Sequence, residues 1–119
     1  MQIQTEYLNE TTAVIRPAGR MDVEASPDVR QALLDLAEKG ATGVIVDLKD
    51  VDFMDSSGLS ALVTGMKALQ KKNGAIRICN TNAQIQTALR LTMLDRILPI
   101  YPSVEEAFAS LHSPATPVL

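Results

Sequence analysis

Tryptophan is absent from this chain, histidine and cysteine occur once each, and neither sign of charge dominates. The aromatic residues are two tyrosines and two phenylalanines, so no platform for stacking nucleic-acid bases is expected. Eleven Lys and Arg against fourteen Asp and Glu give a net charge of −3, which leaves no basic footprint for nucleic acid. The one cysteine, Cys79, has no partner for a disulfide within the chain, which fits a reducing compartment.

Targeting and membrane signals are lacking as well. The first residues contain neither a basic region nor an apolar run, so no signal peptide is predicted, and no apolar stretch approaches the ~20 residues of a spanning helix. The expected location is therefore the cytoplasm. The 119 residues, 46% of them hydrophobic, suffice for one domain with a core. We expect a single domain over residues 1–112 and a flexible tail over 113–119, which holds two prolines.

The stretch from residue 44 to residue 69 organises the prediction. Its mostly apolar start, 44–48, indicates a strand with cover on both faces, and hence a central strand of a sheet. Residues 49–54 are interpreted as a short acidic loop. The segment that follows has apolar side chains three and four residues apart, which predicts a helix with one face on the sheet. The residues of that face are Leu59, Leu62, Val63, Met66 and Leu69.

The rest of the chain predicts alternating strands and helices. Two strands at 3–8 and 12–18 form a hairpin, and Pro17 places the second strand near an edge or at its end because proline cannot donate to a ladder. Residues 19–22 close the hairpin, Ser26 begins a helix with Pro27 in its first turn, and Gly40 ends that helix. Strands at 75–79 and 97–101 and helices after Asn82 and Ser103 complete an α/β sandwich, with helices flanking a mixed sheet.

The sequence Asp55-Ser56-Ser57-Gly58 lies where the predicted strand and loop meet the helix. Asp and Ser are preferred N-caps, so these residues begin the helix at the positive end of its dipole. One interpretation is a cap and a turn only. The other is that a serine hydroxyl is presented there to receive a phosphoryl group, for which free helix amides are a favourable environment.

Other chemistries are less well supported by the pattern. Asp50, Asp52 and Asp55, joined by Asp22 if the fold brings it near them, could serve acid–base catalysis or Mg²⁺, but a solvated acidic loop with one or two caps explains them better. A serine hydrolase needs a base, and the single histidine, His112, lies near the chain end. We therefore predict no catalytic residue, no metal site and no cofactor. Cys79 is interpreted as a buried structural thiol.

The segment from Asp52 to Leu59, DFMDSSGL, closely resembles the signature of the STAS domain family, and within it the small bacterial anti-sigma-factor antagonists. The turn at residues 19–22, GRMD, is similar to that family's Gly-x-hydrophobic-Asp turn, and the resemblance extends from Ile3 to Leu111. It implies a STAS-like α/β fold, a mixed and mostly parallel sheet flanked by about four helices. It also implies that Ser56 is the phosphorylated residue, although the pattern leaves Ser57 open as acceptor.

The resemblance implies a partner switch. The unmodified domain would bind an anti-sigma factor that is also a serine kinase of the GHKL type, and a sigma factor would be released. Phosphorylation of Ser56 would abolish binding, and a separate phosphatase would reset the protein. The residues expected at the partner surface are Asp22, Met54, Asp55, Ser57 and Gly58.

Two alternatives stay open at this stage. A STAS protein can switch a different output, such as secretion, motility or polysaccharide, or can be an unphosphorylated subunit of a lipid transporter. One departure from the family concerns Met93, which stands where many members carry a glycine before the leucine that follows the third helix. Contacts with a partner at that end are therefore in doubt.

Overall fold

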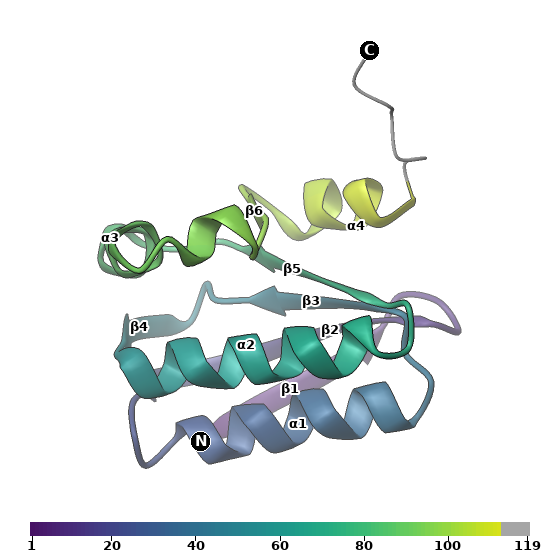
Figure 1. The fold of residues 1–119 in the computed structure, drawn as a ribbon, viewed down its shortest axis with the longest axis horizontal. Helices are drawn as coiled ribbons and strands as arrows, with labels where there is room; N and C mark the ends of the chain where they lie inside the picture. The colour runs from purple at the N-terminus through teal and green to yellow at the C-terminus, as the bar shows by residue number, and fades with distance from the viewer. Residues whose placement is uncertain (113–119) are drawn as a thin grey trace.

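The sheet and its helices are arranged as the alternating pattern predicts (Figure 1). This computed structural model describes residues 1–112, and the predicted flexible tail at 113–119 lies outside the described residues. The described strands are β1 (Gln2–Tyr7), β2 (Thr12–Met21), β3 (Gly43–Asp47), β4 (Val51–Met54), β5 (Ala75–Cys79) and β6 (Ile100–Tyr101). The described helices are α1 (Ser26–Glu38), α2 (Ser56–Gln70), α3 (Ala83–Leu91) and α4 (Val104–His112), with a 3-10 turn, η1 (Leu94–Arg96).

Strand β3 is central, as its apolar sequence predicts. The sheet order is β1-β2-β3-β5-β6, and the pairing is antiparallel between β1 and β2 but parallel everywhere else in the described chain. Every residue of β3 is buried. Val44 and Val46 belong to the larger core with the apolar faces of α1, α2 and α3, whereas Ile45 packs with Cys79 and Ala107 in a smaller cluster under α4. Both faces of β3 are thus covered, which explains the absence of polar–apolar alternation at 44–46.

The prediction of an acidic loop over 49–54 is wrong from Val51 onward. Residues 51–54 form β4, which pairs in parallel with the end of β2, so that Met21 lies opposite Met54. Asp52 is exposed, but Val51 and Met54 are buried, and this burial stabilises the strand although Asp is a residue that strands disfavour. As a result β2 continues to Met21, and the turn after it starts later than the sequence indicates.

Pro17 does not end its strand, contrary to one of two expectations, although the strand lies next to the edge strand β1, as the other predicts. It is inside β2, opposite Ile3 of β1. On its other side, β2 pairs with β3 only as far as Ile15 and with β4 only from Gly19 onward. Pro17 lies in the gap between these two ladders. Neither β3 nor β4 pairs with it there, so its missing N–H costs no ladder hydrogen bond on that side.

The segment after α3 is less extended than predicted. Instead of a strand over 97–101, the chain forms η1 and reaches β6 only at Ile100. Met93 precedes η1 with φ of +61°, a left-handed conformation, and its side chain is 61% exposed. Leu98 is fully buried, and its amide donates to the carbonyl of Leu94, so packing and this turn hold the segment out of the sheet.

Replacing Met93 by glycine is expected to raise the free energy of unfolding by about 0.5 kcal/mol. A left-handed residue with a Cβ costs about 1–2 kcal/mol, and glycine removes this cost while adding chain entropy to the unfolded state. Urea denaturation of the two proteins measures the difference. Leu91→Gly is the control, because Leu91 is also exposed but helical, so glycine there is expected to lower stability by about 1 kcal/mol. A loss of stability in Met93→Gly would contradict the prediction.

No helix within residues 1–112 is long and apolar enough to cross a membrane.

Candidate functional site

The beginning of α2 is fixed by Asp55. Its Oδ1 accepts hydrogen bonds from the amides of Ser57 at 2.8 Å and Gly58 at 3.3 Å, and its backbone carbonyl accepts from Leu59. The sequence left the cap open between the aspartate and the serines, and the structure assigns it to Asp55. Ser56 is therefore the first residue of the helix, and two of the free amides of the first turn already have a partner.

Ser56 is the accessible serine of the pair. Its side chain is exposed, whereas Ser57 is half-buried, and within residues 1–112 the Ser56 hydroxyl makes no hydrogen bond. The backbone that carries Ser56 is held on both sides, by the Asp55 cap and by the helix. The arrangement presents a free hydroxyl on a fixed backbone at the surface, which is what a phosphoryl-transfer enzyme needs in order to reach it.

Gly58 lets the helix approach the ends of β2 and β4. A Cβ at this position would lie 2.6 Å from Cγ of Met54 and 2.8 Å from the backbone oxygen of Met21. The absence of a side chain at Gly58 thus permits this close approach. Met54 is only 1% exposed, so any influence of Met54 on a partner would pass through the position of α2 and not through direct contact.

Asp22 lies close to this helix start because of β4. Asp22 and Asp55 each follow one of the paired residues Met21 and Met54, and the Asp55 amide donates to the carbonyl of Met21 at 3.3 Å. The Asp22 carboxylate accepts from the amides of Glu24 and Ala25, both at 3.1 Å. The sequence left open whether Asp22 lies near Asp55. Strand β4, which the sequence did not predict, explains why it does.

The sequence suggests Ser26 as the N-cap of α1, and the structure corrects this. Helix α1 begins at Ser26, and the residue before it, Ala25, provides no side-chain cap. Ser26 is buried at 1% exposure, and its amide donates to the backbone carbonyl of Asp22 at 2.8 Å. Asp22 therefore organises the turn into α1 in the way that Asp55 organises the turn into α2.

The remaining acidic residues do not form a metal centre. Asp50 and Asp52 are both exposed. Within residues 1–112 no group of three or more His, Cys, Asp or Glu side chains is arranged to hold a metal ion.

A shallow hollow lies beside Ser56, between α1 and α2, which run side by side in Figure 1. Sequence reasoning did not identify its two other notable members, Arg30 and Ser60, because neither belongs to a motif. The signal that could have found Arg30 is its spacing of four residues from Ser26, which places both on one face of α1. The lining residues are Val23, Ser26, Pro27, Arg30, Ser56, Ser57 and Ser60.

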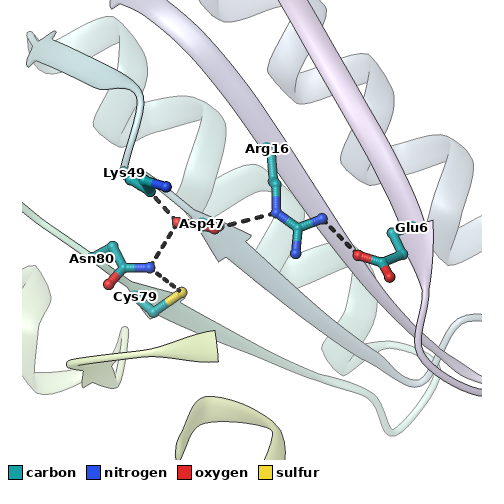
Figure 2. A network of polar contacts seen from close by, with 6 residues as sticks. All are labelled: Glu6, Arg16, Asp47, Lys49, Cys79 and Asn80. Atoms are coloured by element: carbon teal, nitrogen blue, oxygen red, sulfur yellow. Dashed lines mark hydrogen bonds and ion pairs between the residues drawn. The ribbon is translucent and has the colours of Figure 1, made fainter. Parts of the chain in front are cut away.

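A separate polar network closes the carboxyl end of the central strand (Figure 2). Asp47 is 5% exposed, and its carboxylate accepts from Arg16 Nε at 3.3 Å, Asn80 Nδ2 at 2.9 Å and the amide of Lys49 at 3.1 Å. Arg16 also pairs with Glu6 at 2.8 Å, and this hydrogen bond raises the pKa of Arg16 above its usual value. The contacts join β1, β2, β3 and β5, and they satisfy a buried carboxylate that would be costly alone.

Cys79 lies at the edge of that network and is fully buried. Burial raises the pKa of its thiol to about 12, and the nearby Asp47 carboxylate acts in the same direction. The thiol is therefore protonated at neutral pH and a poor nucleophile. This agrees with its interpretation as a structural residue.

Comparison with known proteins places the site in context. The STAS domain family model matches residues 2–107. The anti-sigma-B factor antagonist of Bacillus subtilis strain 168 is 35% identical over 92 residues, which are 77% of this chain and 84% of that protein. An anti-sigma factor antagonist of Mycobacterium paratuberculosis has a solved structure with a TM-score of 0.84 and 23% identity, covering 94% of each chain.

A structure of the Bacillus cell fate determinant SpoIIAA in its phosphorylated form is also similar. It superposes with a TM-score of 0.73 at 25% identity, covering 93% of this chain and 100% of that one. The likeness to these solved structures confirms the predicted fold class, a mixed and mostly parallel sheet with flanking helices.

Proposed function

This chain belongs to the STAS domain family, and on that premise we propose that it is an anti-sigma-factor antagonist controlled by phosphorylation of Ser56. The observation that carries the proposal is the exposed Ser56 hydroxyl, which makes no hydrogen bond within residues 1–112 and whose backbone is fixed by the Asp55 cap. Similarity to a protein whose structure is solved in a phosphorylated form supports it. In this proposal residues 1–112 act as one domain in the cytoplasm, as a binding protein and not as an enzyme.

The unmodified protein would bind an anti-sigma factor that is also a GHKL-type serine kinase. Docking on the surface around Ser56 would displace the sigma factor. The kinase would then transfer the γ-phosphoryl group of ATP to Ser56 Oγ. A base on the kinase takes the hydroxyl proton, and ADP leaves. A separate phosphatase would return the protein to its binding state by transferring the phosphoryl group to water.

The residues around Ser56 explain why a phosphate would end binding. Asp55 already occupies the amides of Ser57 and Gly58, so a phosphate on Ser56 cannot use them without displacing the cap. The phosphate adds close to two negative charges beside the carboxylates of Asp55 and Asp22. Like charges in a desolvated docking surface are costly, so the modified site disfavours the complex. In this role Asp22, Asp55 and Ser57 shape or contact the interface, and Gly58 and Met54 set the position of the helix.

The test is mass spectrometry of the protein isolated from its native cells, with fragmentation across residues 51–62. The expected result is one phosphate on Ser56 that disappears in Ser56→Ala and persists in Ser57→Ala. A phosphate on Ser57 alone would move the switch to that residue. If no phosphate is found under any growth condition, and Ser56→Ala and Ser56→Asp both behave as wild type in the cell, the proposal is overturned.

A further inference from the structure

We propose that Arg30 of α1 is the counter-ion that holds the phosphate of phosphorylated Ser56 across the hollow between α1 and α2. The inference rests on the proposed function only in taking Ser56 as the acceptor. It adds a positioning residue on another helix, and it makes α1 part of the regulated surface.

Arg30 is the charged side chain that lines this hollow. Its other lining residues are serines, Val23 and Pro27. Arg30 is half-buried, and within residues 1–112 it makes no ion pair and no hydrogen bond. A half-buried arginine whose five donors lack protein partners is available for an added anion.

The neighbouring charges are already engaged elsewhere. Asp28, two residues before Arg30, pairs with the amino group of Met1 at 2.7 Å. Arg20, the cation at the end of β2, lies over the ring of Phe53 at 4.2 Å and near Asp22 at 4.0 Å. Within residues 1–112, Arg30 lines the hollow with Ser56 and makes no ion pair, so it is available to a group attached to Ser56.

The charges around Ser56 favour one direction for its phosphate. Asp55 and Asp22 do not line the hollow, their carboxylates would repel the phosphate, and the Asp55 cap occupies the nearest amides. Arg30 lines the hollow, where Ser57 and Ser60 supply further hydroxyl donors. The guanidinium fork matches the geometry of phosphate oxygens, so the phosphate is drawn toward α1 and spans both helices.

The experiment installs phosphoserine at position 56 of the full chain by genetic encoding and follows its ³¹P resonance through a pH titration. Arg30 stabilises the dianion, so the second phosphate pKa is expected to be about half a unit lower in the wild type than in Arg30→Gln. Arg30→Lys keeps the charge but loses the fork, and an intermediate pKa is expected. The carboxylates of Asp22 and Asp55 are the same in all variants and cancel in the comparison.

Lys67→Gln is the matched control, since it removes one positive charge from an exposed position near the far end of α2. It is expected to leave the phosphate pKa at the wild-type value. Equal pKa values in the wild type and Arg30→Gln, with circular dichroism showing both folded, would overturn the inference. Because the phosphate is introduced without a kinase, this result is independent of whether cells phosphorylate Ser56, and each proposal can fail alone.

Discussion

A phosphate on Ser56 is expected to weaken binding to the anti-sigma factor by about 100-fold or more. This corresponds to about 3 kcal/mol, within the several kcal/mol that like charges placed together in an interface typically cost. The phosphate brings close to two negative charges to a surface that already contains Asp22 and Asp55. Most of the loss should appear in the dissociation rate, since the added charge acts at the contact itself.

Surface plasmon resonance can measure this effect with the anti-sigma factor that pairs with the wild-type chain in a two-hybrid screen. Ser56→Asp should weaken binding by about tenfold, since it adds one charge where phosphate adds nearly two. Ser56→Asn is the control of matched size without charge and should bind within about threefold of wild type. A protein with phosphoserine encoded at position 57 instead of 56 tests which of the two serines controls binding. Equal affinities for the modified and unmodified Ser56 proteins would remove the basis for a switch.

Gly58→Ala is expected to lower the free energy of unfolding by about 2–3 kcal/mol. In an ordinary helix this change would raise stability by about 1 kcal/mol. Here the new methyl group would lie 2.8 Å from the backbone oxygen of Met21, and a backbone atom cannot rotate away as a side chain can. Helix α2 must therefore shift outward, which opens the contact with Met54 and strains the bond from the Asp55 amide to Met21.

Guanidinium denaturation followed by circular dichroism measures this loss. Ser60→Ala is the control, because it adds no atoms at an exposed position two residues further along α2 and is expected to change stability by about 0.5 kcal/mol or less. If Gly58→Ala were as stable as wild type, the close packing of α2 against the ends of β2 and β4 would not describe the protein in solution.

The features predicted correctly depend either on regular apolar patterns or on single cap and turn residues. The apolar run of β3 and the spacing of apolar residues in α2 are decided by burial of whole faces, which a single sequence displays. The Asn82 cap of α3 is confirmed by its bond to the amide of Ile85. The turn at Gly40 is confirmed by its φ of +93°. These signals are local, so tertiary structure had little opportunity to override them.

The features missed depend on contacts between distant segments. Strand β4 exists because Val51 and Met54 are buried against other parts of the chain, while its exposed Asp52 imitates a loop residue. Arg30 enters the candidate site only because α1 packs beside α2, and no motif marks it. Ser26 resembles an N-cap in sequence, but α1 has no side-chain cap, and Asp22 instead holds the turn before the helix through the amides of Glu24 and Ala25. Predicting each of these features requires the three-dimensional arrangement of the chain, which a linear pattern does not contain.

The division of β2 between two partners has an evolutionary consequence. Its first half, 12–15, is built into the core beside β3, while its second half, 19–21, carries β4 and the start of α2. The residues that present Ser56 are thus attached to the sheet through a part of β2 that does not pair with the central strand. Substitutions that adapt this end to a new partner can accumulate with little effect on β3 and β5. We therefore expect duplicated copies of such a domain to diverge in partner choice faster than in core sequence.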